Sequence, residues 1–124
     1  MASKLIESYR PVSLDMGAEK WMDVDGVRTR YFDEGEGERI VFIHGVQMGT
    51  TDGSSNARSW ELNFSVLMQA HNCISLDRLG QGYTDNPKCD DDYTMHASVQ
   101  HIIAFLDKLG KKPYHLVGLS LIHI

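Results

Sequence analysis

The stretch Arg39-Ile40-Val41-Phe42-Ile43, followed by His44-Gly45, sets the fold class of this sequence. Its apolar, mostly β-branched residues are continuous rather than alternating, which is typical of a strand buried on both faces of a parallel sheet. Two further short apolar runs, at 73–76 and 114–117, also end at a polar or glycine residue. The three runs predict three parallel strands, all of them buried.

Between these runs, apolar residues recur at helical spacing. The two stripes are Trp60, Phe64, Leu67 and Met68, and then Val99, Ile102, Ile103, Leu106 and Leu109. Ser59 is the predicted N-cap of the first helix; Thr94 and Gly110 are predicted to begin and end the second. On the N-terminal side, Asp25-Gly26 between two β-rich runs predicts a hairpin with a type I′ turn. Strands alternating with helices imply right-handed crossovers and an α/β fold.

The length of 124 residues fits one domain or a piece of one. A net charge of −5 argues against a nucleic-acid binder that relies on bulk charge. The sequence has no apolar run of the roughly 18–20 residues that span a bilayer, and residues 1–19 do not form a secretory signal. We therefore expect a cytoplasmic protein without membrane or nucleic-acid partners. Cys73 and Cys89 are expected to be thiols, and no metal site is expected.

Chemically distinctive residues follow each of the three predicted parallel strands. They are His44-Gly45, then Asp77-Arg78-Leu79-Gly80-Gln81-Gly82, and then Gly118-Leu119-Ser120. In open α/β sheets, functional sites gather at the carboxyl ends of the strands. On a sharp strand-to-helix turn, the Ser120 hydroxyl would lie near helix N-terminal amides, which favour developing negative charge. The full elbow pattern is Gly-x-Ser-x-Gly, with Ile122 in place of the last Gly here, and an ordinary turn is the alternative interpretation.

His44-Gly45 also has two interpretations. In the first, His44 simply ends a strand and Gly45 opens a turn. In the second, the chain turns sharply so that the Val46 amide faces the nucleophile. The Val46 and Leu121 amides would then form an oxyanion hole, and His44 would be structural rather than the catalytic base.

Four motifs, in order along residues 20–118, resemble those of the α/β-hydrolase superfamily. They are Val24-Asp25-Gly26-Val27-Arg28, Val41-Phe42-Ile43-His44-Gly45, residues 76–84 from Leu76 to Thr84, and His115-Leu116-Val117-Gly118. The Asp-Arg-Leu-Gly-Gln-Gly segment and the loop before Trp60 resemble the meta-cleavage product hydrolases, which cleave a carbon–carbon bond in vinylogous 1,5-diketones. The resemblance implies an incomplete, N-terminal part of an α/β-hydrolase sheet: a β-hairpin followed by parallel strands with crossover helices. It also implies an enzyme without a cofactor.

In the mechanism that the resemblance implies, Ser120 attacks a carbonyl and the Val46 and Leu121 amides hold the oxyanion. The family's His and Asp follow later strands, so none of the six His here takes the catalytic position, and the chain alone is expected to be inactive. Gln47 and Asn56 are predicted to contact a small-molecule substrate. Two alternatives remain: a fragment of an Asp-nucleophile haloalkane dehalogenase or epoxide hydrolase, and a non-catalytic α/β module that binds a partner through an open sheet edge.

The sequence is thereby divided into an N-terminal arm (1–19), a hydrolase core portion (20–118) and a tail (119–124). The tail, Leu-Ser-Leu-Ile-His-Ile, departs from the family pattern after Gly118. It also resembles the translation of a common sequencing-library adapter. We expect the native reading to stop near Gly118, in which case the native nucleophile is Ser, Asp or Cys.

Overall fold

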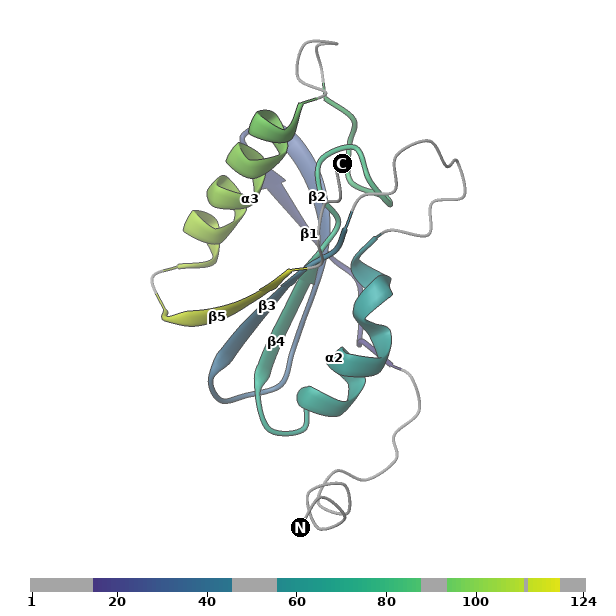
Figure 1. Ribbon diagram of the computed structural model, residues 1–124, viewed down its shortest axis with the longest axis vertical. Coiled ribbons are helices and arrows are strands. Elements are labelled where there is room, and N and C mark those ends of the chain that lie inside the picture. Colours follow the sequence, from purple (N-terminus) through teal and green to yellow (C-terminus); the bar gives the residue numbers. More distant parts are fainter. Residues whose placement is uncertain (1–14, 46–55, 88–93, 111, 119–124) are drawn as a thin grey trace.

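The computed structural model describes residues 15–45, 56–87, 94–110 and 112–118 (Figure 1). Its strands are β1 (Lys20–Val24), β2 (Val27–Glu34), β3 (Arg39–Ile43), β4 (Asn72–Leu76) and β5 (Tyr114–Gly118). Its helices are the 3₁₀ helix η1 (Ala57–Trp60), α2 (Glu61–Leu67) and α3 (Met95–Leu109). The predicted order of hairpin, strand, helix, strand, helix, strand is confirmed.

The five strands form one mixed sheet in the order β1-β2-β4-β3-β5. β1 and β2 form the predicted hairpin, whose turn residues Asp25 and Gly26 have φ values of 49° and 87°. A type I′ turn needs this sign at both positions. β2 pairs antiparallel with β4, whereas β3 runs parallel to both β4 and β5. The parallel part of the sheet therefore consists of the three strands that the apolar runs predict.

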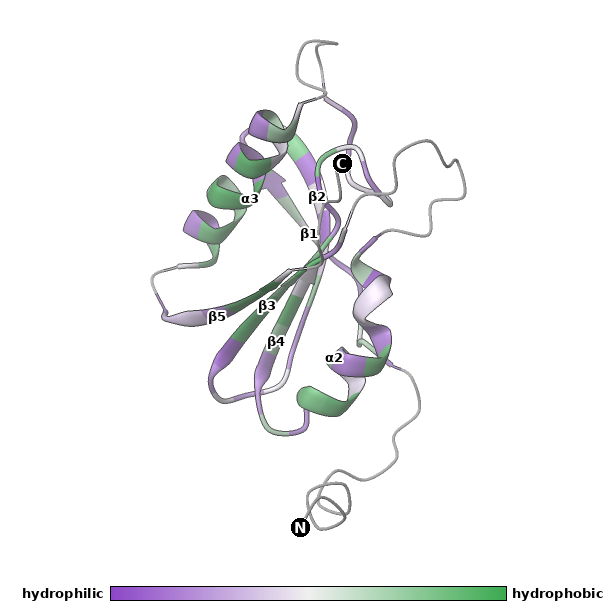
Figure 2. Cartoon of the chain, viewed as in Figure 1, coloured by the Kyte–Doolittle hydropathy of each residue, from purple (hydrophilic) through white to green (hydrophobic). Residues whose placement is uncertain are grey.

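The sheet lies between α2 on one face and α3 on the other (Figure 1). Successive residues of the central strands point to opposite faces, so each face has its own core. Phe42 and Cys73 belong to the cluster that contains Phe64 of α2, while Val41 and Ile74 belong to the cluster that contains Phe105 of α3. Figure 2 shows the resulting hydrophobic band along the middle of β3 and β4. The continuous apolar run at 39–43 is thus explained by burial on both faces.

The edge strand β5 departs from its prediction. All five of its residues are exposed, and the Leu116 side chain is 59% exposed. The prediction of a third buried strand is therefore wrong for burial, although the strand itself is present. The physical reason is position: β5 pairs only with β3, and neither core cluster includes a β5 residue.

The entry to α2 also differs from its prediction. The chain first forms η1, whose N-cap is Asn56 rather than Ser59, and α2 has Trp60 at its N-cap position. The Asn56 side chain accepts from the Arg58 N–H at 2.8 Å, and Ser59 Oγ accepts from the Asn56 N–H at 3.1 Å. Ser59 is therefore the third residue of a capping box and not its cap. By contrast, Thr94 caps α3 as predicted, accepting from the Ala97 N–H at 3.1 Å.

The predicted N-terminal arm is anchored at its end. Met16 is fully buried in the core cluster on the α2 face. The neighbouring Asp15 donates its backbone N–H to Ser65 Oγ of α2 at 3.0 Å and accepts from the same hydroxyl at 3.1 Å. These two contacts attach residues 15–16 to α2.

Candidate active site

The register of the parallel strands brings the three predicted strand ends together. Ile43 of β3 pairs with Leu76 of β4 on one side and with Gly118 of β5 on the other. His44, Asp77 and the residue after Gly118 therefore follow neighbouring strands at one edge of the sheet. Of the predicted site residues, Asn56 is described; Val46, Gln47, Ser120 and Leu121 lie outside the described residues.

His44 links the end of β3 to the end of β4. Its side chain is fully buried. Nδ1 donates to the Gly45 carbonyl at 2.7 Å, because a carbonyl can only accept, and Nε2 accepts from the Arg78 backbone N–H at 3.0 Å. Both ring nitrogens are thus used within the protein. Burial is the main cause that lowers the pKa of His44 to about 4, so the ring is neutral. The structure agrees with the interpretation of His44 as structural.

The low pKa of His44 predicts a loss of stability in mild acid. The unfolded chain takes up the proton at an ordinary pKa of 6.5, whereas the folded chain does so only near 4. The contribution is therefore complete above pH 6.5 and falls as the pH drops from 6.5 to about 4, by roughly 3 kcal/mol. Urea unfolding at pH 7.0 and pH 4.5 measures this difference.

Two variants separate His44 from the other groups that titrate in this range. His44→Asn is expected to remove the His44 part of the pH dependence and to leave the part due to His101, whose pKa is also lowered by burial. His115→Asn, at an exposed position on β5, is expected to retain the full dependence. An equal pH dependence in the parent chain and in His44→Asn would contradict the assignment. If His44→Asn does not fold, NMR titration of the His44 ring in the parent chain gives its pKa directly.

Asp77, the first residue after β4, is a fully buried carboxylate with four donors. Arg30 of β2 donates to it from Nε at 2.7 Å and from one terminal nitrogen at 3.2 Å. The backbone N–H groups of Ala57 and Tyr83 donate at 2.7 and 2.8 Å. The carboxylate therefore joins β2, η1 and the loop after β4. Since every one of these contacts lies within the protein, Asp77 organises the strand ends rather than presenting a carboxylate to a substrate.

The loop after Asp77 closes over this carboxylate. Gly82 has a φ of 54°, and a Cβ on Gly82 would clash with the Asp77 carboxylate, most closely with Oδ2. Thr84 Oγ1 donates to the Asp77 carbonyl at 2.9 Å and accepts from the Arg30 N–H at 3.1 Å. These contacts explain three positions of the Asp-x-x-Gly-x-Gly-x-Thr pattern: Asp77, Gly82 and Thr84.

Replacing Gly82 with Ala is expected to destabilise the chain by about 2–4 kcal/mol, because strained backbone and a steric clash with a buried carboxylate act together. Gly80→Ala is a matched control in the same loop. Its φ is 73°, but its added Cβ would meet nothing closer than Pro87 Cδ at 3.3 Å. Gly80→Ala therefore measures the backbone strain alone, and we expect it to lower the free energy of unfolding by about 1 kcal/mol. Equal losses in the two variants, measured by urea unfolding, would contradict the role given to the Asp77 contact.

Arg78 extends the network to α3. Its guanidinium is buried and donates to Ser98 Oγ from Nε at 3.1 Å and from a terminal nitrogen at 2.7 Å. Another terminal nitrogen lies 3.5 Å from the His44 carbonyl. Burial lowers the pKa of Arg78. Arg78 therefore holds α3 against the ends of β3 and β4.

Asn56, a predicted substrate contact, lies at the N-cap of η1. Its side-chain oxygen is directed to the Arg58 N–H, and the next residue, Ala57, donates to Asp77. Its position at the edge of the Asp77 network places it near the strand ends. Contact with a substrate remains a prediction for this residue.

Sequence reasoning missed Arg30. This residue is only 3% exposed, and its guanidinium lies between Phe32 and Tyr83, at 5.4 and 4.5 Å from the ring centroids. The sequence offered one signal for its role. Arg30 is a cationic residue within a predicted strand, and the chain also has an Asp directly after a predicted buried strand. Such a signal does not identify the partner, because the β2–β4 pairing that joins them is not visible in the sequence.

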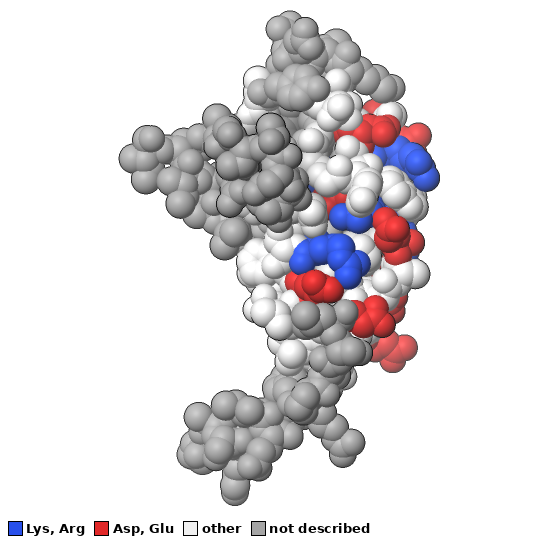
Figure 3. Space-filling view, turned by 90° about the vertical axis from the view of Figure 1, so that its right-hand side faces the viewer, with Lys and Arg blue, Asp and Glu red and all other residues white. Residues whose placement is uncertain are grey.

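No cluster of three or more His, Cys, Asp or Glu that could bind a metal is present within the described residues. None of the described helices is both long and apolar enough to cross a membrane. On the face drawn in Figure 3, acidic and basic side chains lie next to one another rather than in separate patches. Cys73 is fully buried in the core, as predicted, and burial raises the pKa of its thiol to about 11. Cys89 lies outside the described residues.

Comparison with protein families matches residues 38–121 of this chain to the model described as alpha/beta hydrolase fold. This match includes all three strand ends. Among curated relatives, the 2-hydroxymuconate semialdehyde hydrolase of Pseudomonas sp. (strain CF600) is 34% identical over 95 residues, covering 77% of this chain and 32% of that protein. The chain spans about a third of the length of the curated relatives it matches first.

Two solved structures illustrate the similarity in three dimensions. A meta-cleavage product hydrolase from Pseudomonas fluorescens IP01 has a TM-score of 0.68 at 33% identity, covering 82% of this chain and 35% of that one. The Cif epoxide hydrolase from Acinetobacter nosocomialis has a TM-score of 0.69 at 30% identity, covering 83% and 30%. The same architecture thus occurs in proteins named for two different reactions.

Proposed function

The chain belongs to the α/β-hydrolase fold family, and from this premise we propose that it is part of a cofactor-independent hydrolase that cleaves carbon–carbon or ester bonds in a small molecule. The observation that carries the proposal is the meeting of three strand ends in register, with Gly118 beside Ile43 and two residues before Ser120. Relatives named 2-hydroxymuconate semialdehyde hydrolase and meta-cleavage product hydrolase, at 34% and 33% identity, support this substrate class.

In the proposed mechanism, Ser120 is the nucleophile. A His from outside residues 1–124 takes its proton as the hydroxyl attacks a carbonyl, and an Asp, also from outside these residues, orients that His. The Val46 and Leu121 amides stabilise the oxyanion, each contributing roughly 10²–10³ in rate. Residues 1–124 alone are proposed to have no triad activity, because none of the six His matches the family's catalytic position.

The fixed carbonyl of Gly45 supports the role proposed for Val46. His44 Nδ1 holds that carbonyl at 2.7 Å. In a trans peptide, the carbonyl and the following N–H point in opposite directions. With the carbonyl tied toward His44, the next amide is proposed to face away from it, toward the substrate. Gln47, one residue further, and Asn56 are proposed to contact the substrate beside this amide.

A second candidate is an epoxide hydrolase or haloalkane dehalogenase with an Asp nucleophile. It is favoured by the Cif epoxide hydrolase structure, which matches at 30% identity with the same fold. The residue that natively stands two positions after Gly118 separates the candidates: Ser supports the serine hydrolase, and Asp supports this second candidate. A non-catalytic module that binds a partner through the open edge of β5 is the third possibility, and the exposed β5 strand is the feature that supports it.

The decisive experiment is to sequence the source locus past the codon for Gly118 and to assay the protein it encodes. We expect the pattern x-Ser-x-Gly after Gly118, a later Asp and His, and turnover of a vinylogous 1,5-diketone or an activated ester. An Asp at the nucleophile position with epoxide turnover would replace the proposal by the second candidate. Turnover of an activated ester by residues 1–124 alone, abolished by Ser120→Ala, would overturn the proposed dependence on an external His.

A further inference from the structure

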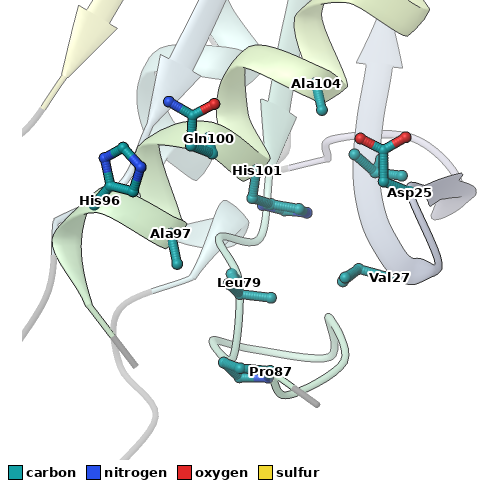
Figure 4. Close-up of a pocket in the computed structure, with 10 residues that line it drawn as sticks. Asp25, Val27, Leu79, Pro87, His96, Ala97, Gln100, His101 and Ala104 are labelled. Carbon is teal, nitrogen blue, oxygen red and sulfur yellow. The ribbon is translucent and has the colours of Figure 1, made fainter. Parts of the chain in front are cut away.

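A pocket of about 380 Å³ lies between α3, the β1–β2 turn and the loop that follows β4 (Figure 4). This volume falls in the range of roughly 300–1,000 Å³ that is typical of small-molecule sites. Most of its wall is apolar, from Val24, Val27, Leu79, Pro87, Ala97 and Ala104. The polar lining residues are Asp25, His96, Gln100 and His101. The lining contains neither His44 nor Gly118, so this pocket is distinct from the proposed active site.

His101 is the buried polar residue of this pocket, with only 6% of its surface exposed. Its Nε2 lies 2.9 Å from Thr29 Oγ1. The single hydroxyl proton of Thr29 is directed to the Val27 carbonyl at 3.1 Å. With its proton on that carbonyl, Thr29 accepts from His101, and this arrangement places a proton on Nε2.

The other ring nitrogen of His101 is then an acceptor without a donor. Burial, and then the charge of Arg78, lower the pKa of His101, so the ring is neutral and Nδ1 carries a lone pair. Nδ1 is buried and has no hydrogen-bond partner among the residues that the structure describes. Native proteins rarely leave a buried acceptor unpaired, because its lost hydration is not replaced. Since His101 lines the pocket, a ligand bound there lies beside the ring that carries this acceptor.

We propose that this pocket binds a small neutral molecule with an apolar body and a hydroxyl group, which donates its hydrogen bond to His101 Nδ1. The apolar wall accounts for the body of the ligand, and the unpaired acceptor accounts for the hydroxyl. The positive charge of Arg78, which acts on His101, disfavours an ammonium group at the same place. The proposal does not depend on the hydrolase activity proposed above.

Cyclohexanol and its methyl ether test the proposal on the 124-residue chain. Both have an apolar ring, but only the alcohol can donate. NMR of ¹⁵N-labelled protein gives both the affinity and the ¹⁵N shift of His101 Nδ1. We expect the alcohol to bind about tenfold more tightly than the ether, as one hydrogen bond implies, and to shift the Nδ1 resonance. Equal affinities, or an unchanged Nδ1 resonance because water alone occupies the site, would overturn the proposal.

Two variants locate the binding site. His101→Gln can keep a donor toward Thr29 but has no acceptor at the Nδ1 position, so it should weaken the alcohol about tenfold and leave the ether unchanged. Ala97→Met fills the pocket and should weaken both compounds, whereas Ala70→Met, at an exposed position outside the pocket, should affect neither. If His101→Gln does not fold, Ala97→Met and Ala70→Met still test the location of the site. Equal affinity of the two variants for cyclohexanol would overturn the proposal.

Discussion

Replacing Asp77 with Asn is expected to destabilise the chain by about 3–5 kcal/mol, the usual effect of removing one partner of a buried ion pair. Asn has the same shape, but its amide NH₂ would face groups that now donate to the carboxylate: Arg30 and the Ala57 or Tyr83 N–H. The Arg30 charge, 3% exposed, would also lose its close carboxylate. Urea unfolding of the parent chain and of Asp77→Asn, followed by circular dichroism, measures this difference in the free energy of unfolding.

The second carboxylate near Arg30 provides the matched control. Glu19 lies 3.4 Å from the same guanidinium, but its side chain is 50% exposed. Exposed ion pairs contribute about 0–1 kcal/mol, so Glu19→Gln is expected to have little effect. The comparison separates burial from charge, because both variants neutralise a carboxylate beside Arg30. A loss below about 1 kcal/mol in Asp77→Asn would refute the central role given to this residue.

In the complete protein, Ser120→Ala is expected to lower kcat by about 10⁴–10⁶-fold, because removing a triad nucleophile leaves only the contribution of binding and the oxyanion hole. KM is expected to change little, since the hydroxyl contributes to the transition state rather than to ground-state binding. Steady-state kinetics on the substrate found in the assay above measure both constants.

Leu62→Ala is the control for this prediction, since Leu62 of α2 is 67% exposed and belongs neither to the capping box nor to the Asp77 network. Its kcat is expected to stay within about twofold of the parent value. Retention of kcat in Ser120→Ala would exclude Ser120 as the nucleophile. It would leave the membership in the fold family unaffected, because that rests on the match over residues 38–121.

Local patterns predicted most elements of the fold. The Asp25-Gly26 turn, the cap at Thr94 and the apolar run at 39–43 each act over a few residues, and the structure confirms them. The apolar run at 114–117 alone did not predict the exposure of β5, because such a run does not reveal whether a helix covers the strand. The open sheet edge considered in the third alternative agrees with this exposure. The cap of the first helix was misassigned because Asn56 and Ser59 both belong to one capping box.

The candidate site was predictable only in outline. The three strand ends carried local signals, and their meeting follows from parallel pairing. The residues that hold them in place come from distant parts of the chain: Arg30 reaches Asp77 across 47 positions, and Thr29 reaches His101 across 72. Such pairs depend on the strand order, with β4 between β2 and β3. No spacing rule within the sequence encodes that order.

The strand order also affects the time course of folding. β2 and β3 are joined by only four residues, 35–38, yet they do not pair with each other, because β4 lies between them. The partners of β3 are β4 and β5, which both follow it in the sequence. Sheets whose pairings join distant segments form slowly, since loop closure precedes the gain from contacts. During synthesis on the ribosome, β1 and β2 can pair early, but β3 lacks a neighbouring strand until Leu76 has emerged.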